Sequence, residues 1–335
     1  MEDMDLKQER RYCSRIGAAL FFVLIWTSAW QYGIIALDVY VLPVRMPDTL
    51  YYALILVGGY AVSLPAAFRI CKGMPPMPFC KELPRARTFV RWAVIGFALM
   101  WIGSLIGNAV TDLVGLVTGR APAPIVDDMV NAMPLSVNIV CVCLLGPLCE
   151  ELLFRGLVAG RLARYGQAPG AFVSALLFAL YHANLEQFFY AFLLGLFLGF
   201  IYVKTGKLGY TIGLHMAINF IGSSLGTWML RVTGYMDTME TLTEFLNTRN
   251  LTVLGDLGNG MVGMFIFGSY ASLILMMAGA GLILMWLNRK KFVCCAPAEK
   301  VASLGKKKVA VMIGNPGILL YGAFWIGIMI WQLLQ

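Results

Sequence analysis

Long apolar runs separated by short polar connections make up most of this chain. A helix needs about 20 apolar residues to cross a bilayer. Nine stretches approach this length, near 16–37, 50–70, 89–111, 134–154, 170–183, 186–203, 208–230, 261–287 and 309–333. Asn315-Pro316-Gly317 is expected to break the ninth stretch near its start, because proline lacks a backbone N–H and clashes with the preceding turn. The pattern predicts an all-α, polytopic transmembrane helix bundle of about 8–9 helices.

Basic residues gather in every second connection, whereas the alternate connections are acidic or nearly neutral. Cytoplasmic loops of membrane proteins carry an excess of lysine and arginine. This asymmetry predicts an integral, multi-pass membrane protein with a cytoplasmic N-terminus. The basic residues that carry this prediction lie at 7–15, 69–91, 161–164, 204–207 and 289–308.

Composition agrees with a membrane protein. Of the 335 residues, 59% are hydrophobic and 13% are charged, whereas soluble domains carry about 25% charged residues. The balance excludes the soluble globular and disordered classes. The formal net charge of +8 is spread between apolar runs, so membrane lipid is the expected partner and nucleic acid is not. The eight cysteines include no C-x-x-C pair and are expected to be reduced, apolar side chains.

The hairpin between the fifth and sixth stretches is short for a bilayer. At about 1.5 Å per residue, each of its helices is only about 22–25 Å long, against a hydrocarbon core of about 30 Å. Its turn carries His182, Asn184 and Glu186. Polar backbone at membrane depth is tolerated only in protein or beside a water-filled cavity, so we expect such a cavity here.

Two adjacent acids stand at the cytoplasmic part of the fourth stretch. Glu151 and Arg155 are spaced i,i+4 in the order that favours an ion pair. Glu150 points about 100° away on the same helix and is free to meet water or substrate as a general base. The alternative interpretation is a pair of interfacial acids at a helix end, capped by Arg155.

The two histidines of the chain also fall within apolar stretches. His182 ends the fifth stretch, and His215 and Asn219 share one face of the seventh at i,i+4 spacing. A single histidine on an apolar helix is usually a satisfied core residue. Intramembrane ionisable groups are nevertheless costly, and a carboxylate, two imidazoles and an amide suffice for hydrolysis.

Other kinds of site lack their motifs. The chain has no H-E-x-x-H, and no serine or cysteine has an obvious neighbouring base. Gly195 and Gly199 form a small-xxx-small pattern, which predicts a helix-packing face.

The motifs in this order resemble the CPBP family, the CAAX-protease and bacteriocin-processing (Abi) proteins, which include type II CAAX prenyl endopeptidases. The resemblance rests on Glu150-Glu151-x-x-x-Arg155, Phe178-x-x-x-His182 and His215-x-x-x-Asn219. It implies N-terminal transmembrane helices and connecting loops over 1–133 and a catalytic core over 134–225. The extracytoplasmic loop and C-terminal transmembrane helices would then occupy 226–335.

The resemblance further implies an intramembrane endopeptidase with a conical catalytic cavity, acting on a membrane-associated peptide or a lipidated, prenylated protein. By this likeness Glu150 activates water with His182, His215 and Asn219 stabilise the oxyanion, and Glu151, Arg155 and Phe178 support them. A metal-free, glutamate-dependent form is favoured, with no cofactor. The alternative is a zinc metalloendopeptidase with Glu150, His182 and His215 as ligands.

The depths of these residues in the membrane, counted from helical rise, argue against contact between His182 and the other site residues. At about 1.5 Å per residue, Glu150 and His215 lie about 10 Å from the cytoplasmic face, but His182 lies about 18–20 Å from it if a straight helix begins at 170. Two other functions are compatible with intramembrane acids and histidines. A non-catalytic immunity or regulatory protein could use the same scaffold. A proton-coupled transporter could use intramembrane acids and histidines, although the chain shows no related halves.

Overall fold

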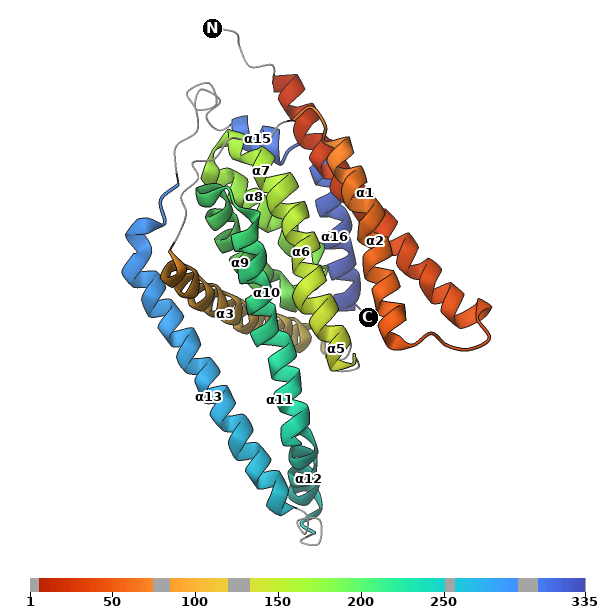
Figure 1. Cartoon of the computed structure of the whole chain (residues 1–335), viewed down its shortest axis with the longest axis vertical. Helices are drawn as coiled ribbons and strands as arrows, with labels where there is room; N and C mark the ends of the chain where they lie inside the picture. Colours follow the sequence, from red (N-terminus) through yellow and green to blue (C-terminus); the bar gives the residue numbers. More distant parts are fainter. Residues whose placement is uncertain (1–5, 75–84, 120–132, 251–256, 295–306, 335) are drawn as a thin grey trace.

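The computed structural model describes residues 6–74, 85–119, 133–250, 257–294 and 307–334, and all regular secondary structure within these ranges is helical (Figure 1). The predicted all-α, polytopic architecture is therefore confirmed. Seven helices in these ranges are long and apolar enough to cross a membrane, namely Leu6–Val41, Asp48–Ile70, Ala86–Thr118, Leu135–Tyr165, Leu185–Thr205, Gly260–Lys291 and Pro316–Leu333. The predicted stretch 170–183 is a shorter helix, and 208–230 is continuously helical without joining the seven.

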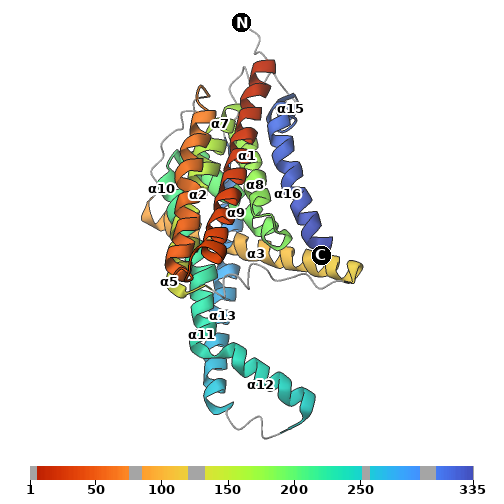
Figure 2. The same cartoon turned by 90° about the vertical axis from the view of Figure 1, so that its right-hand side faces the viewer.

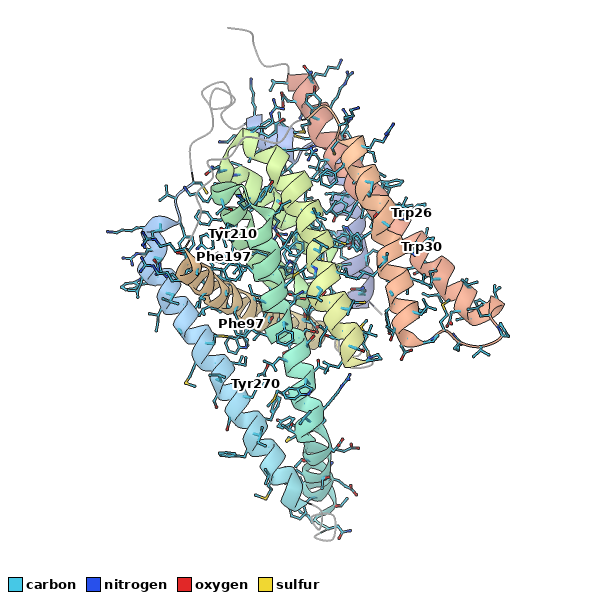
Figure 3. All side chains as sticks on the ribbon, viewed as in Figure 1. Trp26, Trp30, Phe97, Phe197, Tyr210 and Tyr270 are labelled. Atoms are coloured by element: carbon cyan, nitrogen blue, oxygen red, sulfur yellow. The ribbon has the colours of Figure 1, made fainter. Side chains whose placement is uncertain are left out.

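The first two spans form a hairpin. Helix α1 (Leu6–Ala36) continues through a π-helical turn, η1 (Leu37–Val41), and packs against α2 (Asp48–Ile70). The indole of Trp30 donates a 2.8 Å hydrogen bond to the carbonyl of Leu54, and that of Trp26 reaches the carbonyl of Gly58 at 3.5 Å (Figure 3). These bonds satisfy indole donors that apolar surroundings would otherwise leave unpaired.

The fourth span changes its helical pitch along its length. It runs without a break through α5 (Leu135–Asn138), η2 (Ile139–Leu145), α6 (Gly146–Glu151), η3 (Leu152–Ala159), α7 (Gly160–Leu162) and η4 (Ala163–Tyr165). Segments η2 and η3 are π-helical, a geometry that often marks functional sites. Pro147 lies two residues after the end of η2, and its missing N–H and bulky ring disfavour the ordinary α-helical register there. The two acids of α6 thus lie between two π-helical segments.

Helices α8 (Gln167–Tyr181) and α9 (Leu185–Thr205) form the central hairpin. The side chain of Asn184 caps α9 by accepting hydrogen bonds from the backbone N–H groups of Glu186 and Gln187. Gly195 and Gly199 lie against α8, where a Cβ on Gly195 would come within 2.9 Å of the Phe178 ring. The predicted packing face is confirmed. The expectation of two short helices holds only for α8, because α9 has 21 residues.

The seventh stretch extends into an arm. Helices α10 (Leu208–Asn219), η5 (Phe220–Leu225) and α11 (Gly226–Thr233) form one continuous rod, followed by α12 (Tyr235–Thr248). Helix α13 (Leu257–Asn288), which ends in the 3-10 turn η7 (Arg289–Lys291), packs beside α11 and α12 (Figure 2). The loop predicted at the start of 226–335 therefore contains a helix, α12.

Helix α3 (Ala86–Thr118) crosses the start of α9 at close range. A Cβ on Gly103 would come within 2.3 Å of the Tyr190 Cα atom, and one on Gly107 within 2.2 Å of the Glu186 carbonyl oxygen. Small residues allow such backbone approach between membrane helices. Helix α3 also contacts α10 and α13, so the central hairpin is enclosed on this side.

The last stretch is broken as predicted, into α15 (Lys307–Met312) and α16 (Pro316–Leu334). Asn315 makes the join, because its amide donates to the carbonyls of Val311 and Met312 while its oxygen accepts from the N–H of Ile318. The predicted span 309–333 therefore begins at Pro316. Helices α15 and α16 both pack against α1 (Figure 2).

Candidate active site

Glu151 forms a fully buried ion pair with Arg155 one turn along the fourth span. Its carboxylate lies 3.1 Å from the guanidinium, and both side chains are 0% exposed. Burying two charges costs free energy unless each has a partner. Here Arg155 also donates to the Gly195 carbonyl at 3.3 Å. The i,i+4 pair predicted from the sequence is confirmed.

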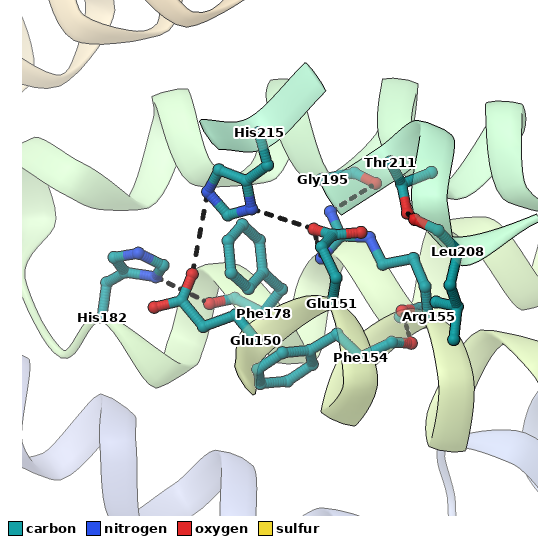
Figure 4. Close-up of polar contacts among 11 residues, drawn as sticks. Glu150, Glu151, Phe154, Arg155, Phe178, His182, Gly195, Leu208, Thr211 and His215 are labelled. Atoms are coloured by element: carbon teal, nitrogen blue, oxygen red, sulfur yellow. Dashed lines mark hydrogen bonds and ion pairs between the residues drawn. The ribbon is translucent and has the colours of Figure 1, made fainter. Parts of the chain in front are cut away.

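His215 joins the two acids (Figure 4). Its Nδ1 lies 2.9 Å from Glu151 Oε1, and its Nε2 lies 3.7 Å from Glu150 Oε2. Because a carboxylate only accepts, Nδ1 carries the proton toward Glu151. The Glu150 side chain is 18% exposed whereas that of Glu151 is 0% exposed, so the two adjacent acids occupy different environments.

Phe178 packs against the charged groups. Its ring lies 4.6 Å from the Arg155 guanidinium carbon and meets the His215 ring edge-on, with centroids 5.8 Å apart. The His182 ring is 4.8 Å from the same phenyl ring. An aromatic face attracts the cation, and the edge-on geometry suits the ring quadrupoles. Phe178 therefore orients three polar side chains at once.

His182 lies beside the other site residues. Its Nδ1 is 2.9 Å from the Phe178 carbonyl oxygen, which leaves Nε2 for another partner. The expectation that His182 lies too deep for contact is wrong, because the rings of both histidines pack against the same phenyl ring. We call Glu150, Glu151, Arg155, Phe178, His182 and His215 the acid–histidine cluster.

Asn219 points its amide at a backbone carbonyl. Its Nδ2 donates to the Val142 oxygen at 3.0 Å. The N–H of Gly146 bonds the carbonyl of Cys141, and Pro147 has no N–H. Neither residue can donate a backbone hydrogen bond to the Val142 carbonyl, so the side chain of Asn219 donates one instead. One of its two amide hydrogens is thereby used, and one remains.

Two tyrosines that sequence reasoning missed border the cluster. The hydroxyls of Tyr60, on α2, and Tyr181, on α8, lie 2.6 Å apart, and the Tyr181 ring centroid lies 6.4 Å from that of His182. The Tyr181 ring also stacks edge-on against Trp325 of α16, with centroids 5.9 Å apart. Nothing in the spacing links Tyr60 to Tyr181, which are 121 residues apart.

The residues of the zinc alternative are not gathered as a metal site in this arrangement. Within the described ranges, no three histidine, cysteine, aspartate or glutamate side chains lie close enough together to hold an ion. The Nδ1 atoms of His182 and His215 face the Phe178 carbonyl and Glu151, which leaves Nε2 of each ring for another partner. Histidines that bind a metal commonly make the same Nδ1 bonds, so metal content stays a prediction for metal analysis to test.

The fold and the cluster define a polytopic membrane protein with an acid–histidine site among its helices. Residues 132–221 match the family model described as Type II CAAX prenyl endopeptidase Rce1-like. The match falls on the region that holds the acid–histidine cluster, and the resemblance to the CPBP/CAAX protease family read from the sequence is confirmed.

Two curated proteins are similar over part of the chain. The membrane-embedded CAAX protease MroQ of Staphylococcus aureus (strain USA300) is 32% identical over 139 residues, which are 39% of this chain and 55% of that protein. The putative membrane peptidase YdiL of Bacillus subtilis (strain 168) is 25% identical over 134 residues, which are 39% of this chain and 53% of that protein. The chain thus spans about half the length of the curated relatives it matches. No solved structure shows a significant match.

Proposed function

We propose that this chain is an intramembrane endopeptidase that hydrolyses a peptide bond of a membrane-associated peptide or lipidated protein. The observation that carries the proposal is His215, which lies between a buried acid and a partly exposed acid. That arrangement holds one imidazole in a fixed orientation and leaves one carboxylate for water.

Glu150 acts as the general base. It takes a proton from water as the oxygen attacks the carbonyl carbon, and it returns that proton to the nitrogen as the C–N bond breaks. Its partial exposure allows a water molecule to reach it, unlike the sealed carboxylate of Glu151. His182, with Nδ1 fixed by Phe178, holds the water through Nε2.

Charge that develops on the carbonyl oxygen needs donors. In its imidazolium form His215 keeps the Nδ1 bond to Glu151 and donates through Nε2 on the side of Glu150, and Asn219 retains one amide hydrogen after serving Val142. Preorganised donors of this kind stabilise an oxyanion without reorganising during the reaction. Glu151, Arg155 and Phe178 are positioning residues, because they act through His215.

The substrate class follows from the relatives and the environment. MroQ is named a CAAX protease and YdiL a putative membrane peptidase, and the cluster lies among helices long enough to cross a bilayer. A lipidated or membrane-associated peptide therefore fits this site better than a soluble protein.

The test compares native-host membranes that contain the wild type or Glu150→Gln, which keeps the shape of the side chain. Proteomics of peptide termini should find at least one new N- or C-terminus that depends on Glu150 and on His215. Glu240→Gln, an exposed acid on α12, is the matched control and should cleave normally. Normal cleavage by Glu150→Gln would contradict the proposal and favour the non-catalytic alternative.

A further inference from the structure

A pocket of about 600 Å³ lies between the start of α1 and the α15–α16 join, away from the acid–histidine cluster. We call it the basic pocket, because Lys7, Arg10, Arg11 and Lys307 contribute to its lining. Its volume falls in the range of about 300–1,000 Å³ that is typical of small-molecule sites.

The cations come from two elements that are distant in the sequence. Arg10 and Ser14 are spaced i,i+4 on α1, which puts them on one face, and Lys307 begins α15 opposite that face. Arg10, Arg11 and Lys307 are exposed and have no hydrogen bond or ion pair with another residue in the described part of the chain. The acid on this turn of α1, Glu9, is instead buried against Arg164 and Tyr165. The charges of Arg10, Arg11 and Lys307 are therefore left for an external anion.

The rest of the lining is apolar. Leu6, Val311 and Pro316 contribute to it, and Val311 is buried in the core. The α1–α16 contact below is tight, because a Cβ on Gly17 would come within 2.1 Å of the Gly317 backbone. A site for a free inorganic ion does not need an apolar wall beside its cations, whereas an amphiphile uses both.

We propose that the basic pocket binds the headgroup of an anionic phospholipid, with its glycerol and upper acyl region against the apolar wall. The position of the pocket supports this ligand. Helices α1 and α16 are both long and apolar enough to span a bilayer, and the pocket lies at the start of each. Basic pockets between transmembrane helices at the cytoplasmic side hold anionic headgroups. The proposal does not depend on the proposed peptidase activity.

The test uses the purified full-length protein with phosphatidylglycerol and phosphatidylcholine in equal amounts, and native mass spectrometry counts the lipid retained. The wild type should retain phosphatidylglycerol selectively. Each basic residue near a membrane surface strengthens anionic-lipid binding about fivefold, so Arg10→Gln/Arg11→Gln/Lys307→Gln should weaken retention at least about tenfold.

Two further variants separate a pocket from general surface charge. Ala310→Trp adds bulk at a residue that lines the pocket without changing any charge, and it should also lose phosphatidylglycerol. Arg289→Gln/Lys290→Gln/Lys291→Gln removes three charges from η7 and should retain the lipid. All variants keep Glu2, Asp3 and Asp5, so any competition from these acids is the same in each. Thermal unfolding in detergent checks that each variant folds.

Two results would overturn the proposal. The first is undiminished phosphatidylglycerol retention by both the triple variant and Ala310→Trp. The second is complete displacement of the lipid by a tenfold excess of inorganic phosphate, which would identify a site for free phosphate instead.

Discussion

The side-chain amide of Asn219 donates a 3.0 Å hydrogen bond to the backbone carbonyl of Val142. That carbonyl needs a side-chain donor because Gly146 bonds Cys141 and Pro147 carries no N–H. A proline on one helix thus fixes an amide on another. This relationship leads to a prediction about a residue outside the acid–histidine cluster.

Pro147→Ala should lower the turnover number and leave KM nearly unchanged. The alanine N–H can bond the Val142 carbonyl and compete with Asn219 for it. Loss of one oxyanion donor costs about 10²–10³-fold in rate, so Asn219→Ala should show a loss of that order and Pro147→Ala a part of it. Single-turnover cleavage of a peptide that spans the mapped cleavage site measures both.

The Pro147→Ala/Asn219→Ala double variant is the control for that coupling. If the proline acts through Asn219, the double variant should cleave no more slowly than Asn219→Ala alone. Independent, multiplicative losses would mean that Pro147 affects the site by another route.

Arg155→Met should strongly destabilise the protein, because it leaves the fully buried Glu151 without its cation. Breaking one partner of a buried pair typically costs about 3–5 kcal/mol. Thermal unfolding in detergent measures the effect, and Glu151→Gln/Arg155→Met should recover part of it. As a matched control, Arg45→Met removes the partly exposed Arg45–Asp38 pair and should change the unfolding temperature little. Equal losses from the buried and exposed pairs would contradict this account.

Tyr60→Phe should destabilise the contact between α2 and α8. It leaves the Tyr181 hydroxyl without the partner that lies 2.6 Å away, at a typical cost of about 1 kcal/mol. Tyr60→Phe/Tyr181→Phe removes both hydroxyls and should be more stable than Tyr60→Phe alone. Chemical denaturation of the three variants provides the comparison, and simple additivity of the single changes would argue against a direct hydroxyl pair.

Gly195→Ala should reduce cleavage more than stability. Its Cβ would come within 2.9 Å of the Phe178 ring, and that ring packs against Arg155, His182 and His215. Gly279→Ala on α13 is the matched control, since nothing lies within 4 Å of its added Cβ. Cleavage rate and unfolding temperature are measured together for both variants. Unchanged cleavage by Gly195→Ala would show that the Phe178 ring can shift without affecting the site.

Hydropathy and helical spacing predicted the features that depend on the sequence of a single helix. The positions of most spans, the Glu151–Arg155 pair and the break at Pro316 follow from apolar length, i,i+4 geometry and proline chemistry. The separation of Glu150 from Glu151 follows in the same way, because adjacent residues on a helix face different directions.

Contacts between helices were less accessible from the sequence. The bond between His215 and Glu151 joins residues 64 apart, and only packing brings them together. The π-helical segments η2, η3 and η5 shift the helical register, and no spacing in the sequence marks them. The hydrogen bond from the Asn219 amide to the Val142 carbonyl could therefore not be predicted. A count of residues along a straight helix also argued against contact by His182, because such a count holds no information on packing between helices, which brings both histidines to the Phe178 ring.

The packing of α1 against α16 also affects the order in which the helices assemble during synthesis. Ser14 accepts a hydrogen bond from the N–H of Gly317, 303 residues later. At about 5–20 residues per second, the ribosome makes α16 on the order of 15–60 s after this part of α1. Throughout that interval the Gly17 face of α1 lies in the membrane without the helix that will cover it, and the α16 side of Tyr181 stays open as well. Assembly of the central helices therefore precedes closure of the bundle around them.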